Sequence, residues 1–120
     1  MAKILIVDDS PTTAGLYKAA LEEEGHEIIT AGDGEEGLNK IKSEKPDLII
    51  MDVMLPKLDG FHVCRMIKFD EKYKKVPVIM LTAKASDEDK RLGSEVGADD
   101  YLVKDEGIEA LVELVKKRLK

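Results

Sequence analysis

The sequence predicts an α/β fold in which a doubly wound, five-stranded parallel sheet is covered by five helices. Two observations lead to this prediction. Short apolar runs alternate along the chain with stretches whose apolar residues recur at the helical period. The runs are continuously apolar, as expected for parallel strands that are buried on both faces. The length of 120 residues suits one core, so residues 1–120 are expected to form a single domain.

The first predicted elements are a strand at 3–7, a helix at 11–24 and a strand at 27–31. The two strands have the sequences KILIV and EIITA, which are rich in branched apolar residues. Ser10 is a suitable N-cap for the helix, and Pro11 suits its first position. Gly25 is expected to end it.

The middle of the chain is predicted to form a helix at 34–44, a strand at 47–51 and a helix at 59–69. Leu38 and Ile41 share one side of the first helix. Pro46 breaks the pattern before the apolar strand DLIIM. Asp59, followed by glycine, is expected to open the next helix.

The last predicted elements are a strand at 77–82, a helix at 86–96, a strand at 99–103 and a helix at 107–119. Ser86 is the expected cap of the first of these helices, and Gly97 is expected to end it. The last helix carries one apolar stripe, formed by Ile108, Leu111, Val112, Val115 and Leu119.

The composition narrows the classes of function. The formal net charge of -6 argues against nonspecific binding of nucleic acid, which requires a basic face. No apolar run approaches the roughly 20 residues that span a bilayer, and no signal-peptide pattern is present. Cys64 is the only cysteine, which suits a reducing compartment, so we expect a cytoplasmic protein. Abundant Lys and Glu, with Asn39 as the only amide residue, favour a heat-loving source.

Polar residues with reactive groups follow four of the predicted strands. Asp8 and Asp9 follow the first, Asp52 the third, Thr82 ends the fourth, and Lys104 follows the fifth. Ligands of an open parallel sheet bind beyond the carboxyl ends of its strands, where the strand order reverses. In the flavodoxin-like order 2-1-3-4-5, the first and third strands are neighbours at that point. The five side chains are therefore expected to crowd one edge of the sheet.

Three carboxylates at one place require a compensating cation. Hard carboxylate oxygens suit Mg2+, with Mn2+ as the alternative ion. A divalent ion, the Lys104 ammonium and the Thr82 hydroxyl would together form a receptor for phosphoryl oxygens. Asp52 is then the best candidate nucleophile, because carboxylates form aspartyl phosphates. Any one of these residues alone could equally be a solvated strand end.

Four segments resemble one family. ILIVDDS, PDLIIMDVMLPKLDG, PVIMLTA and GADDYLVK are similar, in order and spacing, to the receiver domain of two-component response regulators. The resemblance covers nearly the whole chain. It implies that Asp52 accepts a phosphoryl group from a phosphohistidine on a histidine kinase or phosphotransfer protein. It also implies that Asp8 and Asp9 help to hold Mg2+, with Asp52 and the backbone carbonyl of Met54 as further ligands.

The resemblance also implies a conformational switch. Thr82 and Lys104 would bind the phosphoryl oxygens, and Tyr101 would turn inward as Thr82 moves toward the phosphate. The face of the fourth helix, fifth strand and fifth helix would then present a changed surface to a protein partner. From its residue type alone, Tyr101 would be interpreted as a packing residue rather than as a switch. In the family a proline joined by a cis peptide usually follows the lysine, whereas here Asp105 follows Lys104, so this loop could be trans.

Three other functions compete with this interpretation. A phosphatase resembling haloacid dehalogenases would need an acid two residues beyond Asp52, where this chain has Met54. A flavodoxin-like cofactor binder would need a hydroxyl- and glycine-rich loop after the first strand to bind phosphate, whereas the loop here, DDSPTT, begins with two negative charges that would repel it. The intact Asp52, Thr82 and Lys104 argue against a degenerate receiver that binds partners without phosphorylation, and only the Asp105 that follows Lys104 argues for it. We therefore expect a stand-alone receiver: a Mg2+-dependent phosphoacceptor that catalyses its own phosphorylation and dephosphorylation, is not otherwise an enzyme, and binds neither DNA nor membrane directly.

Overall fold

The computed structural model describes residues 2–53, 55, 59–82, 91, 95–104 and 107–119. It contains a five-stranded parallel sheet in the order β2-β1-β3-β4-β5, so the predicted fold class and strand order are confirmed. The strands are β1 (Lys3–Val7), β2 (Glu27–Ala31), β3 (Leu48–Asp52), β4 (Val78–Thr82) and β5 (Asp100–Val103). The helices with described bounds are α1 (Pro11–Glu23), α2 (Gly34–Glu44), α3 (Gly60–Lys68) and α5 (Ile108–Leu119). The helix predicted at 86–96 falls largely outside the described residues.

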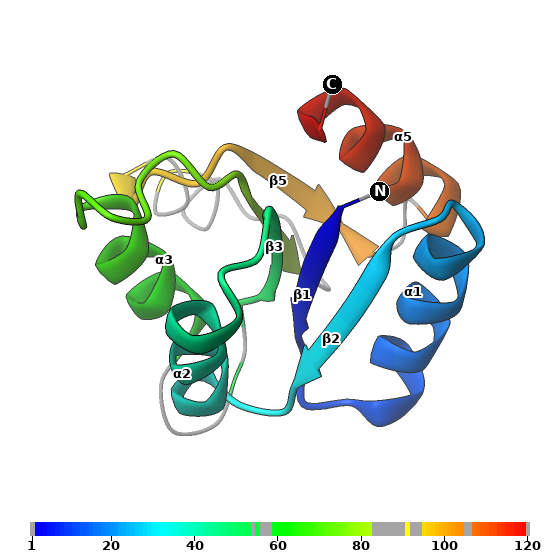
Figure 1. Cartoon of the computed structure of the whole chain (residues 1–120), viewed down its shortest axis with the longest axis horizontal. Helices are drawn as coiled ribbons and strands as arrows, with labels where there is room; N and C mark the ends of the chain where they lie inside the picture. The colour runs from blue at the N-terminus through cyan, green and yellow to red at the C-terminus, as the bar shows by residue number, and fades with distance from the viewer. Residues whose placement is uncertain are drawn as a thin grey trace.

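The sheet separates two apolar layers. In Figure 1, α1 and α5 cover one face, and α2 and α3 cover the other. Side chains of β1 alternate between the layers: Ile4 and Ile6 pack with α1 and α5, whereas Leu5 and Val7 pack with α2 and α3. These four side chains are at most 1% exposed, because a strand in the middle of a parallel sheet is covered on both faces.

The helices begin where side-chain oxygens can accept their free N–H groups. The Ser10 hydroxyl accepts from the N–H of Thr13 at 3.3 Å, with proline at the first helical position, as predicted for α1. The Asp59 carboxylate accepts from the N–H of His62 at 2.9 Å and caps α3, which confirms the predicted start. Gly25, with φ of +95°, follows α1 in the left-handed region that glycine adopts readily.

The third strand runs from Leu48 to Asp52, one residue later than predicted. Asp47 lies one residue before the strand; its backbone N–H donates to the carbonyl of Lys3 at 2.7 Å, and its carboxylate accepts the backbone N–H of Lys3 at 2.8 Å. Asp52, although acidic, continues the sheet as the partner of Leu81. The other predicted bounds agree with the described elements to within one residue. No helix in the described part of the chain is long and apolar enough to cross a membrane.

Candidate functional site

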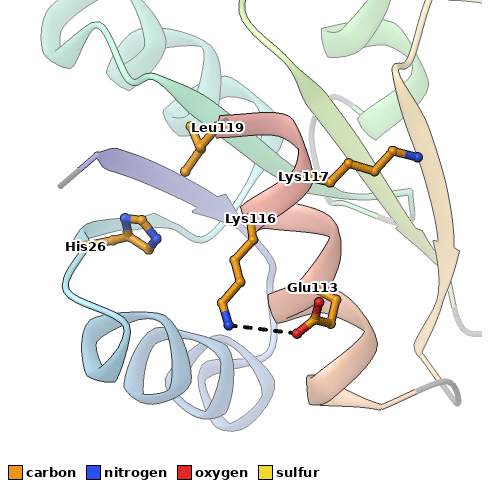
Figure 2. A pocket seen from close by; sticks show the side chains of 5 residues that line it. All are labelled: His26, Glu113, Lys116, Lys117 and Leu119. Carbon is orange, nitrogen blue, oxygen red and sulfur yellow. Dashed lines mark ion pairs between the residues drawn. The ribbon is translucent and has the colours of Figure 1, made fainter.

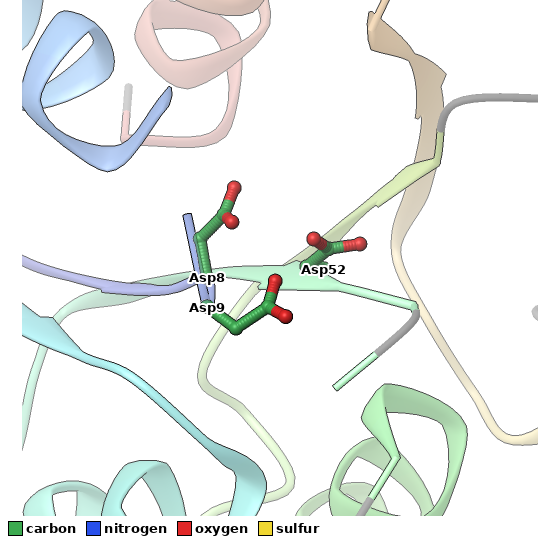
Figure 3. A group of neighbouring side chains, drawn as sticks. All are labelled: Asp8, Asp9 and Asp52. Carbon is green, nitrogen blue, oxygen red and sulfur yellow. The ribbon is translucent and has the colours of Figure 1, made fainter. Parts of the chain in front are cut away.

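Three carboxylates meet at the carboxyl edge of the sheet. Asp8 directly follows β1, Asp9 comes next, and Asp52 is the last residue of the neighbouring strand β3. One oxygen from each side chain lies within 4.8 Å of the others, and Figure 3 shows the three side chains gathered at these strand ends. The strand order therefore brings together three residues that the sequence analysis placed at one edge.

The three carboxylates differ in burial. Asp8 is 4% exposed and Asp52 is 6% exposed, whereas Asp9 faces solvent. The backbone N–H of Asp8 donates to the carbonyl of Ala31 at 3.0 Å, and one Asp8 oxygen accepts from the N–H of Ser10 at 2.9 Å. These contacts fix Asp8 between β2 and the start of α1, and the exposed Asp9 leaves the cluster open to solvent on one side.

Lys104 reaches back to two of the carboxylates from the residue that follows β5. Its Nζ atom lies 3.0 Å from Oδ2 of Asp52 and 3.4 Å from Oδ2 of Asp8. Burial alone would lower the pKa of Lys104, but the hydrogen bond to Asp52 and the charges of Asp52 and Asp8 outweigh it and raise this pKa. Lys104 therefore stays protonated at neutral pH and offsets part of the negative charge.

Thr82 lies on β4, the strand beside that of Asp52, and Tyr101 lies on the next strand, β5. Thr82 is the last residue of β4 and is 5% exposed. It pairs with Val103, and Met80 pairs with Tyr101, so Thr82 and Tyr101 lie on the same face of the sheet. Met54, the expected source of a carbonyl ligand, lies outside the described residues. The same holds for Asp105 and hence for the Lys104–Asp105 peptide bond.

Gly60 allows the start of α3 to pack against the backbone of Asp52, a role that was not predicted from the sequence. A Cβ atom at Gly60 would lie 2.1 Å from the backbone oxygen of Asp52, closer than any side chain tolerates. The Gly60 N–H also donates to the carbonyl of Val53 at 3.0 Å. The first turn of α3 thus packs directly on the end of β3. The Asp59-Gly60 pair was noted only as a helix start, and that signal could not reveal the contact.

Tyr17 of α1 is a second residue that the sequence analysis did not single out. Its side chain is buried in the layer beneath α1 and α5. Burial raises the pKa of the Tyr17 hydroxyl; the Lys104 charge lowers it, and the charges of Asp8 and Asp52 raise it further. The hydroxyl therefore lies within electrostatic range of the cluster, and it is neutral at physiological pH.

The donor set of the cluster fits a hard divalent cation. All three side chains offer carboxylate oxygens, and among the described residues one ammonium, that of Lys104, lies within 4.0 Å of them. Carboxylate oxygens suit Mg2+, which keeps several waters and needs few protein ligands. The residues present could therefore hold such an ion.

A large surface hollow lies elsewhere on the molecule. The hollow has a volume of about 600 Å³ and is lined by His26, Glu113, Lys116, Lys117 and Leu119. Figure 2 shows these side chains between the turn before β2 and the end of α5. Lys116 is paired there with Glu113 at 3.8 Å and with Glu24 at 3.2 Å. None of the described residues predicted for the site lines this hollow, so its large size does not indicate a reactive site.

Comparison with known proteins identifies the family. Residues 4–116 match the family described as the response regulator receiver domain. This chain belongs to that family. The assignment decides against the phosphatase and the cofactor binder as alternatives, and it agrees with the resemblance of the four motifs.

Individual relatives and solved structures support the same family assignment. The chain is 52% identical over 102 residues to the alkaline phosphatase synthesis transcriptional regulatory protein PhoP of Bacillus subtilis (strain 168). That match covers 85% of this chain but 42% of PhoP, so the receiver spans less than half of that relative. The chemotaxis protein CheY4 of Vibrio cholerae is 38% identical, with a TM-score of 0.91 and 98% of both chains covered. The receiver domain of a Syntrophus aciditrophicus histidine kinase is 38% identical, with a TM-score of 0.93, covering 99% of this receiver and 90% of that chain.

Proposed function

We propose that this receiver is a Mg2+-dependent phosphoacceptor that takes a phosphoryl group onto Asp52 and signals to a protein partner. The observation that carries the proposal is the meeting of three carboxylates within 4.8 Å at the carboxyl edge, with Lys104 bound to Asp52. Three acidic groups at one place destabilise a fold unless a cation binds there. Membership of the receiver family supports the same chemistry.

In the proposed reaction, an Asp52 oxygen attacks the phosphorus of a phosphohistidine carried by a histidine kinase or phosphotransfer protein. The new P–O bond forms as the P–N bond breaks, and the electron pair of that bond leaves with the donor imidazole, which takes up a proton. Later attack by water would release phosphate and restore the carboxylate. The receiver would thus catalyse its own phosphorylation and dephosphorylation.

Asp8, Asp9 and Asp52 would hold Mg2+ in this proposal, together with the Met54 carbonyl. The ion would neutralise the charge that develops on the phosphoryl oxygens. Lys104 would bind another phosphoryl oxygen, because its raised pKa keeps it protonated. To do so it would exchange part of its contact with Asp52 for a contact with the new phosphate.

The proposed switch joins Thr82 to Tyr101. The Thr82 hydroxyl would bind a phosphoryl oxygen, and Tyr101 would turn inward as Thr82 moves. The shared face of the two side chains supports this coupling. The surface formed by β5, α5 and the predicted fourth helix would then change and meet a downstream protein. We place the reaction in the cytoplasm, since the one cysteine, Cys64, is a free thiol.

The test is the mass of the intact protein after incubation with acetyl phosphate, with and without Mg2+. We expect one phosphoryl adduct on the wild type that requires Mg2+, and no adduct on Asp52→Asn. The matched control is Asp47→Asn, which makes the same change just before the same strand. There the amide oxygen can still accept the Lys3 N–H.

Labelling of Asp52→Asn at the wild-type level would overturn the assignment of the acceptor. Labelling of the wild type to the same extent with and without Mg2+ would overturn the role of the metal. Loss of the adduct in Asp47→Asn would mean that the assay reports folding rather than the acceptor, so circular dichroism is recorded on each variant.

A further inference from the structure

A pocket of about 440 Å³ lies at the amino edge of the sheet, opposite the acidic cluster. It is formed where α2 ends before β3 and where the turns after α3 lead into β4. Its lining consists of Ile41, Lys45, Pro46, Lys72, Tyr73 and Val76. The sequence analysis and the proposed function leave this pocket unassigned.

The lining divides into an apolar floor and a cationic rim. Ile41 and Pro46 are buried, and Val76 and Tyr73 are half-buried against the layer of α2 and α3. Lys45 and Lys72 are exposed. An apolar floor with a few polar groups at the mouth, in a volume between about 300 and 1,000 Å³, is typical of sites for small ligands.

The lysines around this pocket contrast with the rest of the chain. Residues 40–46 and 68–76 hold seven lysines and three acidic residues, although the whole chain has a net charge of -6. The three acids have other partners than the Lys45 and Lys72 ammonium groups. Glu44 pairs with Lys3 at 3.3 Å, Glu71 pairs with Lys74 at 2.9 Å, and the Asp70 carboxylate accepts the backbone N–H of Lys72 at 2.8 Å. Within the part of the chain that the structure describes, no carboxylate lies within 4.0 Å of the ammonium of Lys45 or Lys72.

We propose that this pocket binds a small organic acid with an aromatic or branched apolar body. The body would lie on Ile41, Pro46 and Val76 beside the Tyr73 ring, and the carboxylate would lie between the two ammonium groups. Removal of apolar surface from water would supply most of the affinity. The ammonium groups would select anions over neutral molecules.

The dimensions favour a small molecule over a protein segment. A stable protein interface buries about 800 Å² on each partner, contributed by some 20–30 residues. Six lining residues cannot supply that area. The hollow of Figure 2 is a useful contrast, because its Lys116 is already paired with Glu113 and Glu24. Lys117 in that hollow has no carboxylate partner among the described residues either, so the amino-edge pocket differs in that neither of its two lysines is paired there.

The test is a titration of the full chain with phenylpropionate, followed by proton–nitrogen correlation NMR. We expect saturable shifts of backbone amides concentrated in 41–45 and 72–76. Phenylpropanol, which lacks the charge, and acetate, which lacks the ring, are expected to bind more weakly. The double variant Lys45→Gln, Lys72→Gln should bind phenylpropionate about tenfold more weakly, the effect of two exposed ion pairs.

The matched control is Lys18→Gln, Lys117→Gln, which removes two exposed lysines that line no part of the pocket. It should bind like the wild type. Equal binding by the Lys45, Lys72 double variant, or no saturable shift with phenylpropionate, would overturn the proposal. Shifts of the same amides by an acidic phenylalanine-containing peptide, but not by phenylpropionate, would also overturn it and assign the pocket to a protein.

Discussion

Two lysine–carboxylate clusters at opposite edges of the sheet differ in how their charges are balanced. At the amino edge, Lys68 Nζ lies 2.9 Å from Oδ2 of Asp99, just before β5. The same oxygen accepts the N–H of Val78 at 2.8 Å, and Lys68 also donates to the carbonyl of Val76 at 3.0 Å. One cation meets one anion here, and the backbone adds one hydrogen bond to each of them.

The carboxyl edge has the same kinds of groups in a different proportion. Lys104 contacts Asp52 and Asp8, and Asp9 adds a third carboxylate within 4.8 Å. Among the described residues, one ammonium therefore faces three carboxylates. Partly buried like charges that are not matched by a cation lower stability.

The difference suggests a way to tell a structural ion pair from a candidate cation site. A balanced cluster contributes to the stability of the fold without any ligand. An unbalanced cluster contributes its full stability once a cation binds, because binding to the folded state alone adds to the free energy of unfolding.

Gly60→Ala should have the largest effect, because it acts on the backbone beneath the acidic cluster. The new Cβ would meet the Asp52 oxygen at 2.1 Å, and both segments are backbone that cannot rotate away. We expect the free energy of unfolding to fall by ~3 kcal/mol, at the upper end for overpacked sites. Urea unfolding measures this loss.

The matched control is Gly15→Ala on the exposed side of α1, where a Cβ meets none of the described atoms within 4 Å. Alanine in a helix should raise stability there by about 0.5–1 kcal/mol. A loss of less than about 1 kcal/mol for Gly60→Ala would contradict the close approach of α3 to β3.

Asp99→Ala removes the anion of the balanced cluster. It leaves the Lys68 ammonium, in a side chain that is 11% exposed, and the Val78 N–H without their carboxylate. We expect a loss of ~2 kcal/mol, within the range for an unpaired, partly buried group. The increase in melting temperature on adding Mg2+ should match that of the wild type. A change in that increase would mean that the two edges are coupled.

The acidic residues at the carboxyl edge could be predicted from the sequence, because each is marked locally by its position at the end of an apolar run. An apolar run that ends in Asp8, or continues to Asp52, marks a strand end, and the parallel order then gathers the ends together. The correspondence of Thr82 and Lys104 to the family's motifs adds to that signal. The limits of the strands were predicted only to within one residue. Asp47 was assigned to the third strand, which begins at Leu48, and both its backbone N–H and its carboxylate bond to Lys3.

The ion pair at the amino edge could not be predicted, because it depends on contacts between segments that lie far apart in the sequence. Asp99 was expected to be the first residue of a strand, whereas its carboxylate pairs with Lys68, 31 residues earlier. Gly60 beneath Asp52 is a further example, since no periodicity marks a backbone-to-backbone approach. Contacts between elements depend on how the layers pack, and one sequence carries no direct record of that packing.

Asp9→Ala should act in opposite directions on stability and metal binding. In EDTA it removes one of three neighbouring negative charges, so the free energy of unfolding should rise by about 0.5 kcal/mol, as for an exposed charge. Mg2+ affinity, measured by calorimetry, should fall at least about tenfold. Glu22→Gln, an exposed change on α1, is the control and should alter neither quantity. A lower stability in EDTA would contradict the unbalanced cluster.

Cys64 should report the balanced cluster by its reactivity, the smallest of the four effects. Burial raises the pKa of its thiol from 9.0 to about 12; the charge of Lys68 lowers this pKa, and that of Asp99 raises it. Because the folded pKa is the higher one, the thiol's contribution to stability is complete below pH 9.0 and is lost as the pH rises toward about 12.

In Asp99→Ala the Lys68 charge acts on this thiol without its counter-ion, so the pKa of Cys64 should fall. We expect faster reaction with a disulfide reagent at pH 9 than in the wild type, measured at a low urea concentration where both proteins stay folded. Asp100→Ala is the control, because the thiol pKa responds to Asp99 and Lys68. Burial remains the main cause in both proteins, so the thiol should stay far slower than that of the unfolded chain. Equal rates in Asp99→Ala and the wild type would show that the carboxylate of Asp99 does not influence the thiol.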